Sequence, residues 1–325
     1  MQRLVLRVVL VALAGAVSLA LAGAGSATVR GKNGRIVFAA TAGRFSQLFT
    51  VEPDGSGLKQ VTRFGDSDAM NANWSPNGNR IVFERDFPSG HNGIYSIHAD
   101  GSGLRSLTSH MKKGFFPSTP AYSPDGKKII FGRGVCLTED CTGPRDEGGL
   151  WIENADGTGA RRITPPIRPG PRGPRFLDHP QVSPDGKRIA YVKDLGEDRA
   201  AVFVAAMHRD GRAGAGKRLT SFVQGVDERV DWSPNGKLLL FSDNYRGPDI
   251  WTIHPNGTGL KRIYRAIDGN YSADSWSPNG KKIVLVRGAN GSVDLAVMNA
   301  DGSGLRQVTH GLNIAGGGGD WGTHP

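Results

Sequence analysis

A short turn motif that returns at nearly regular intervals constrains this chain more than any other feature. It reads W-S-P-N-G at residues 74–78, 232–236 and 276–280, Y-S-P-D-G at 122–126 and V-S-P-D-G at 182–186. Successive glycines of the motif are 48, 60, 50 and 44 residues apart. Repeats of this length are supersecondary units that bury their apolar face by stacking against their neighbours.

A second turn motif lies between successive copies of the first. It is D-G-S-G-L at 54–58, 100–104 and 301–305, D-G-T-G-A at 156–160 and N-G-T-G-L at 256–260, with a stretched copy that starts at Asp210. An apolar residue and usually a threonine follow each copy, as in Val61-Thr62 and Val308-Thr309. The chain therefore contains six units.

The sequence of one unit predicts four strands. Proline fixes φ at the second position of the Ser-Pro turn, and glycine takes the left-handed conformation that ends it. An apolar strand such as 80–83 follows, then a shorter strand such as 94–97, and the D-G-x-G turn leads to the last strand. Together with the segment before Ser-Pro, this pattern predicts an all-β, six-bladed propeller with four antiparallel strands per blade.

The two ends of the chain carry complementary parts of one blade. Residues 33–38 read as a turn end and a second strand without a first strand, and Trp321 lies 45 residues after Trp276, in step with the repeat. We therefore expect the C-terminal strand to join the N-terminal blade and close the ring. Closure removes the exposed sheet edges that an open solenoid, the alternative, would leave.

Residues 1–27 have the pattern of a secretory signal peptide. Arg3 and Arg7 flank the start of an apolar stretch at 8–21, and the small residues 22–27 follow. This stretch is shorter than the roughly 20 residues of a membrane span, so we expect cleavage after Ala24 or Ala27 rather than a retained anchor. Residues 28–325, the propeller, are then expected to be soluble and secreted or periplasmic, and not integral to a membrane.

Cysteine content and charge limit the chemistry further. Cys136 and Cys141 are expected to close a small disulfide loop in an exported protein. The formal charge is +10, or +8 without Arg3 and Arg7, which suits contact with anionic envelope polymers as well as ordinary surface charge. The densest basic stretch, 161–175, alternates with prolines rather than aromatic residues, so nucleic-acid binding is not expected.

The repeat W-S-P-D/N-G-k-x-I-x-F, followed by D-G-x-G and L-T, resembles the TolB-type, WD40-like (PD40) propeller repeat over about residues 30–325. The resemblance implies an exported propeller that binds other proteins. TolB has a further N-terminal domain, and a related propeller caps prolyl-oligopeptidase-type serine peptidases. We see no counterpart of either accompanying domain in the sequence, so a TolB translocation role and serine peptidase activity are not expected.

The first strand of each propeller blade lies innermost, so residues just before the Ser-Pro turns are expected around the mouth of the central channel. Acidic and polar groups recur there, although the protein is basic overall. The candidate binding residues are Asp68, Asn71, Phe116, Thr119, Asp178, His179, Asp227, Glu228, Tyr271, Asp274 and Asp320. Such a mouth suits a cation or a basic or polar peptide, although polar residues at this place also simply solvate loops.

The sequence favours a non-catalytic propeller that binds a protein or peptide in the cell envelope. One alternative is a hydrolase or lactonase that uses a calcium ion in the channel, which requires convergent carboxylates and a base that the sequence does not identify. A second alternative is a polysaccharide-binding module, for which only Phe116, Phe176 and Tyr271 supply aromatic rings near the rim. No catalytic residue and no metal ligand is assigned.

Overall fold

The computed structural model describes residues 30–109, 116–134, 148–167, 176–194, 199–221, 226–243, 248–267, 269–289 and 291–325. The predicted signal peptide, 1–27, and the predicted Cys136–Cys141 disulfide lie outside these residues. All regular elements in the described ranges are strands. No helix there is long and apolar enough to cross a membrane.

Six antiparallel sheets of four strands make up the fold. Blade 1 contains β24 (Ile314–Thr323), β1 (Asn33–Ala42), β2 (Phe45–Val51) and β3 (Lys59–Gln60). Blade 2 contains β4 (Asp68–Trp74), β5 (Arg80–Asp86), β6 (Asn92–His98) and β7 (Arg105–Ser106). Blade 3 contains β8 (Pro117–Tyr122), β9 (Lys128–Arg133), β10 (Gly149–Asn154) and β11 (Arg161–Arg162).

The remaining three blades repeat the same order. Blade 4 contains β12 (Phe176–Val182), β13 (Arg188–Asp194), β14 (Ala200–Ala206) and β15 (Lys217–Arg218). Blade 5 contains β16 (Val226–Trp232), β17 (Leu239–Asp243), β18 (Ile250–Ile253) and β19 (Lys261–Tyr264). Blade 6 contains β20 (Asn270–Trp276), β21 (Lys282–Ala289), β22 (Ser292–Asn299) and β23 (Arg306–Gln307).

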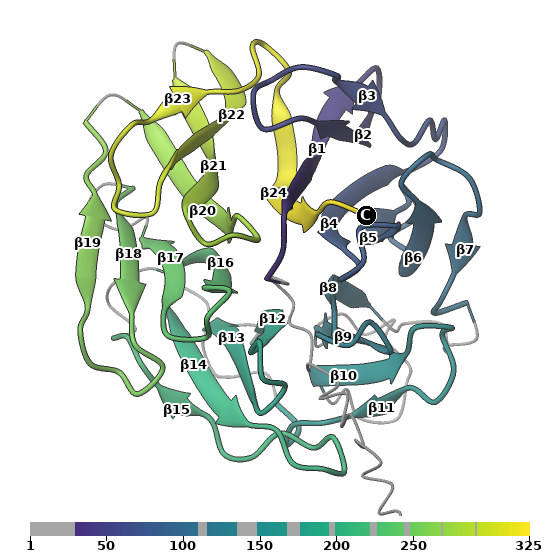
Figure 1. The fold of residues 1–325 in the computed structure, drawn as a ribbon. Helices are drawn as coiled ribbons and strands as arrows, with labels where there is room; N and C mark the ends of the chain where they lie inside the picture. Colours follow the sequence, from purple (N-terminus) through teal and green to yellow (C-terminus); the bar gives the residue numbers. More distant parts are fainter. Residues whose placement is uncertain are drawn as a thin grey trace, which may run out of the picture.

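The sheets are arranged as a ring, with the first strand of each blade nearest the axis and the last strand at the rim (Figure 1). The C-terminal strand β24 pairs with β1, where Trp321 lies opposite Ile36 and Asp320 opposite Val37. The predicted six-bladed propeller, its four-stranded blades and its closure by the C-terminal strand are therefore confirmed.

One residue anchors each blade in the core. In blades 2–6 it is the residue before the Ser-Pro turn, and in blade 1 it is Trp321, at the equivalent place in β24. Five of these residues are aromatic, at most 5% exposed, and lie in successive apolar clusters: Trp74, Tyr122, Trp232, Trp276 and Trp321. The clusters combine residues of adjacent blades, because each sheet presents one face to the blade before it and one to the blade after it. Blade 4 departs from this rule, since its anchor is Val182.

A ring of polar contacts near the axis joins neighbouring blades. The Asp320 carboxylate of blade 1 accepts a hydrogen bond from the backbone N–H of Trp74 in blade 2, at 2.6 Å. Asn73 accepts in the same way from Tyr122 at 3.0 Å, and Asp231 accepts from Trp276 at 2.8 Å. These residues stand one position before an anchor, where the alternation of a strand directs side chains to the opposite face.

A second ring of contacts lies at the rim and involves basic residues. The outermost strand of every blade carries a lysine or arginine at the same place: Lys59, Arg105, Arg161, Lys217, Lys261 and Arg306. Four of them donate to a backbone carbonyl in the D-G turn region of an adjacent blade. Part of the positive charge of the protein therefore holds the blades together.

Glu153 breaks the apolar pattern of the core. It pairs with Ile129, and the corresponding residues of the other blades are Val51, Ile97, Ala205, Ile253 and Met298. The Glu153 side chain is buried, and neither carboxyl oxygen has a hydrogen-bond partner among the described residues. Burial, with a smaller contribution from Asp156, raises the pKa of Glu153 to about 8.

Candidate binding site at the channel mouth

Side chains close the central channel. Residues from all six innermost strands converge on the axis and leave a cavity of about 20 Å³, which is enough for about one water molecule. Asp231, Asp274, Asp320 and His179 are buried there, beside the half-buried Arg229. Burial raises the pKa of Asp320 to about 6, although the Trp74 N–H and the Arg229 charge oppose this shift.

A much larger cavity, of about 450 Å³, opens over blades 2, 3 and 4. It is lined by the beginnings of β4, β8 and β12 and by the ends of β5 and β13. The Ser-Pro turns follow the other ends of the innermost strands, so this cavity and the turns lie on opposite faces of the ring. We call it the mouth cavity.

The mouth cavity is acidic. Four carboxylates line it, from Glu84, Asp86, Asp178 and Asp194, and no lysine or arginine is found among the described residues of its wall. His179 also lines the cavity, but burial and the nearby Arg229 charge hold its pKa well below the usual range. His179 is therefore neutral near pH 7, and the cavity carries a net negative charge in a protein that is basic overall.

Glu84 organises the floor of this cavity. Its Oε2 accepts hydrogen bonds from the Asn71 side chain at 2.9 Å and from the Thr119 N–H at 3.1 Å, and its Oε1 accepts from Asn92 at 3.1 Å. Thr119 Oγ1 in turn accepts from the His179 N–H at 3.0 Å. One carboxylate thus links blades 2 and 3, and a hydroxyl extends the network to blade 4.

The backbone of the cavity floor has an unusual conformation. Asn71, Thr119 and His179 stand three residues before their anchors and have φ values of 51°, 48° and 49°. Each lies at a bulge in the innermost strand. Left-handed conformations are uncommon for residues other than glycine, above all for a β-branched threonine, and they concentrate at functional sites. Here the Glu84 network stabilises two of the three positions directly.

Asp86 is the most perturbed group of the cavity. Burial and the neighbouring charges of Glu84 and Asp68 raise its pKa to about 7. Its Oδ1 is buried and has no donor among the described residues, and the same holds for Oδ1 of Asn92. The Asn92 amide is oriented because its Nδ2 donates to Glu84 and to the Pro117 carbonyl. Two buried acceptors therefore lack a donor beside a crowded carboxylate.

Aromatic rings complete the wall. Phe116 precedes β8 and Phe176 begins β12, and both are half-buried where they line the mouth cavity. The lining thus combines carboxylates with aromatic rings, a combination that favours lysine, arginine or another ammonium group. The alkyl part of a lysine would also find apolar surface there.

The predicted candidate residues separate into five groups, of which the last is Tyr271 alone. Asn71, Phe116, Thr119, Asp178 and His179 line the mouth cavity. Asp274 and Asp320 lie in the small axial cavity instead. Asp68 borders the site indirectly, since it pairs with Asp86 and its Oδ1 accepts from the Ser46 N–H at 2.7 Å. Asp227 and Glu228 belong to β16, but their side chains lie outside the described residues.

Tyr271 lies elsewhere, because its side chain is 2% exposed in the core cluster of blades 5 and 6. Its hydroxyl accepts a hydrogen bond from Arg287 at 2.8 Å.

The sequence analysis did not predict Glu84, Asp86 and Asp194. They lie toward the C-terminal ends of β5 and β13, the second strands of their blades, and not before a Ser-Pro turn. The sequence does contain a signal for two of them. Asp86 and Asp194 are the last residues of equivalent strands, and each follows a run of apolar residues in its strand.

The described residues contain no group of three or more histidine, cysteine, aspartate or glutamate side chains that is arranged to hold a metal ion. The acidic floor nevertheless suits an organic cation, because its carboxylates are spread around a cavity rather than converged on one point. The geometry is thus that of a binding site for a positively charged group with an apolar stem.

Comparison with known proteins agrees with this fold. Residues 176–316 match the family model of the TolB beta propeller domain. The protein is 29% identical over 122 residues to the Tol-Pal system protein TolB of Francisella tularensis subsp. mediasiatica, which covers 38% of this chain and 26% of that protein. It is 26% identical over 231 residues to dipeptidyl-peptidase 5 of Porphyromonas endodontalis, which covers 60% of this chain and 32% of that protein.

These matches span about a third or less of the length of both curated relatives. Among solved structures, TolB from Acinetobacter baumannii superposes with a TM-score of 0.69 at 19% identity, over 90% of this chain and 67% of that one. Identity at this level supports the propeller architecture alone.

Proposed function

We propose that this chain, a six-bladed propeller built from TolB-type repeats, binds a positively charged segment of a partner protein in its mouth cavity. The observation that carries the proposal is a cavity of about 450 Å³ lined by Glu84, Asp86, Asp178 and Asp194, with no lysine or arginine among the described residues of its wall. A bound ammonium or guanidinium group would form charge-assisted hydrogen bonds with these carboxylates.

The size of the cavity suits a peptide side chain or chain end better than a bare ion. Ligand pockets for small molecules and side chains typically measure about 300–1,000 Å³. The half-buried Phe116 and Phe176 offer contact to the stem of a lysine or to the plane of an arginine. This arrangement favours a protein partner over a polysaccharide.

We place the protein and its partner in the cell envelope, after export directed by residues 1–27. The likeness to Tol-Pal system protein TolB supports this placement, as does the signal-peptide pattern of the sequence. A channel calcium ion with hydrolase or lactonase activity stays the alternative proposal. Metal analysis of the purified protein separates the two, since one tightly held calcium per chain would favour the enzyme.

A labelled tetralysine peptide tests the proposal directly. We expect saturable binding by the wild-type protein, and a loss of about tenfold or more in affinity for the double variant Asp86→Asn with Asp178→Asn, because each removes a carboxylate next to the cation. A matched tetraglutamine peptide should not bind. Higher salt should weaken binding only in part, since the site is partly buried.

The control variant removes the same amount of charge on the other face. Asp54→Asn with Asp185→Asn alters two exposed turn residues, and asparagine occupies the equivalent turn positions at 256 and at 77, 235 and 279. This variant should bind tetralysine like the wild type. Equal losses in both double variants would mean that binding reflects overall charge, and the mouth cavity would then not be the site.

A further inference from the structure

The junction between blades 3 and 4 differs from the other five on the face that carries the turns. Its anchor is Val182, where each other blade places tryptophan or tyrosine. The side chain is buried like the other anchors, at 4% exposure, but it is much smaller. Replacing a large aromatic side chain by valine leaves space that the surrounding strands fill only in part.

The Ser-Pro turns show that blades 3 and 4 lie farther apart than their neighbours at this face. A Cβ atom built on the turn glycine would lie 3.5–3.6 Å from the proline Cδ of the preceding blade's turn in blades 3, 5 and 6, at Gly126, Gly236 and Gly280. At Gly186, the equivalent glycine of blade 4, nothing lies within 4 Å. The turn of blade 4 therefore stands away from Pro124 of blade 3.

A longer loop in blade 4 borders the resulting space. Residues 207–216 connect β14 to β15, whereas blade 2 uses only 99–104 for the same connection. The extra residues bring Met207, His208 and Arg209 to the junction. The result is a cavity of about 380 Å³, which we call the junction cavity.

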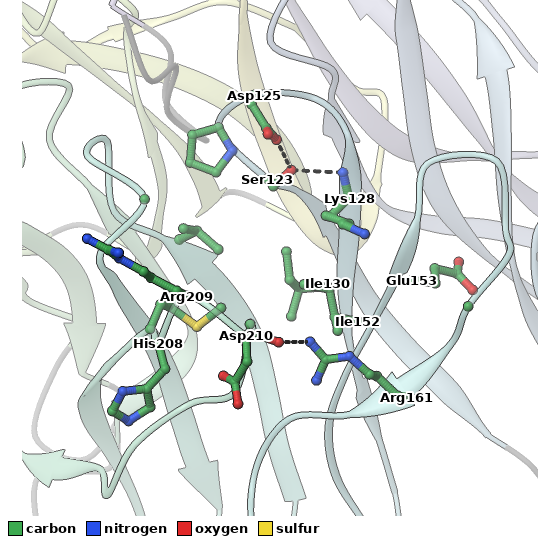
Figure 2. Close-up of a pocket in the computed structure, with 16 residues that line it drawn as sticks. Ser123, Asp125, Lys128, Ile130, Ile152, Glu153, Arg161, His208, Arg209 and Asp210 are labelled. Atoms are coloured by element: carbon green, nitrogen blue, oxygen red, sulfur yellow. Dashed lines mark hydrogen bonds between the residues drawn. The ribbon is translucent and has the colours of Figure 1, made fainter.

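The junction cavity has an apolar floor and a positively charged edge. Figure 2 shows Ile130 and Ile152 in its middle, Lys128 on one side, Arg161 on another and Arg209 opposite them. Val182 and Met207 complete the apolar part. Arg161 donates to the Asp210 carbonyl and so closes the outer edge.

Three carboxyl groups also line the junction cavity. Glu153 is buried, and burial raises its pKa to about 8, so it is protonated and neutral near pH 7. The other two carboxyl groups are already engaged. Asp125 accepts from the Ser123 hydroxyl at 2.6 Å and from the Lys127 N–H at 3.1 Å, and Asp210 accepts from the Arg212 N–H at 2.9 Å. Lys128 gives one donor to Asn154, at 2.5 Å, which leaves two of its three. Arg209 is exposed and makes no hydrogen bond or ion pair within the described chain. The edge therefore has spare donors for an anion.

We propose that the junction cavity binds a ligand that carries an aromatic ring next to a carboxylate. The ring would occupy the space that an aromatic anchor fills in the other blades, over Ile130, Ile152 and Val182. The carboxylate would accept hydrogen bonds from Lys128 and Arg209. This site is independent of the mouth cavity, because it lies on the other face of the ring and shares no lining residue with it.

Calorimetric titration with N-acetyl-L-tryptophan tests this site. We expect a dissociation constant below about 1 mM, in the range for a ligand of this size. N-acetyl-L-tryptophanamide, which has the ring but no carboxylate, should bind about tenfold more weakly, and acetate should not bind measurably. Absence of saturation by N-acetyl-L-tryptophan up to about 10 mM would overturn the proposal.

Two variants locate the binding. Val182→Trp restores the anchor of the other blades and should abolish binding while it keeps or raises the melting temperature. Arg209→Ala changes an exposed side chain, so it should fold normally and lower the affinity about three- to tenfold. Unchanged affinity in both variants would place the ligand elsewhere and refute the assignment.

The same chemistry is available from a free aromatic acid or from the last residue of a partner peptide. A hexapeptide that ends in tryptophan and its C-terminally amidated form distinguish these sources. Tighter binding of the free-acid peptide than of N-acetyl-L-tryptophan identifies a chain end, and equal or weaker binding identifies a small acid. Either ranking supports the site, whereas equal binding of the amidated peptide contradicts the role given to Lys128 and Arg209.

Discussion

The buried Glu153 makes the stability of this propeller depend on pH in a calculable way. Its carboxyl has a pKa of about 8 in the folded protein and an ordinary value of 4.5 otherwise. The folded state thus retains a proton that the unfolded chain has lost, so stability is fully present below pH 4.5 and falls as pH rises toward 8. Each pH unit between these limits costs about 1.4 kcal/mol.

The perturbation is Glu153→Gln, which removes the ionisation and preserves the shape. From about pH 5 to about pH 7.5, the wild type should lose about 3 kcal/mol relative to this variant, because the folded carboxyl resists ionisation over that range. The Glu153→Ile variant should have a still higher free energy of unfolding than the glutamine variant, since isoleucine occupies the equivalent positions 97 and 253. Urea denaturation followed by tryptophan fluorescence measures the free energy of unfolding at each pH.

The comparison with the glutamine variant cancels the titration of every other group. The difference in unfolding free energy between the two proteins should be small at about pH 5 and largest near pH 8. A difference that stays constant within about 0.5 kcal/mol over this range would refute the reasoning. Glu153 would then be ionised in the folded state and paired with a group outside the described residues.

Two further predictions concern ring closure and the mouth cavity. Trp321→Ala should lower the free energy of unfolding, measured by chemical denaturation, by about 3–5 kcal/mol. The reason is that Trp321 is 3% exposed and its indole N–H donates to the Gly34 carbonyl. If the change is no larger than that caused by Trp251→Ala, at a half-buried tryptophan, Trp321 has no special role in ring closure. Tetralysine affinity should rise up to about tenfold from pH 6 to pH 8, because Asp86, with a pKa of about 7, gains its charge over this range. The Asp86→Asn variant should show a flat profile, and a wild-type profile that is equally flat would count against Asp86 as a ligand contact.

The fold could be predicted from the sequence because its signals are local and repeated. Each Ser-Pro turn and each D-G-x-G turn marks a fixed place in a blade, so blade number and closure followed from counting them. The V-S-P-D-G copy has Val182 where the other Ser-Pro copies have an aromatic ring, but the consequence of this difference was not predicted. The cavity beside Val182 required the structure, because it depends on the spacing of two blades.

The mouth cavity could be predicted only in part. Asn71, Thr119 and His179 were found because they lie at a constant distance from the anchors. Glu84 and Asp86 come from the next strand, and their importance arises from contacts with blade 3 that no pattern within one repeat reveals. Tyr271 shows the converse, because a polar aromatic residue at the expected place turned inward to the core and to Arg287.

The closed axis determines how a partner can enter the mouth cavity. Asp231, Asp274, Asp320, Arg229 and His179 leave room there for about one water molecule. No polypeptide can therefore be threaded from one face of the ring to the other. A chain end that enters the mouth cavity must therefore leave by the opening through which it came. A segment that continues past the site has to run across the mouth, so that only a basic side chain reaches into the cavity.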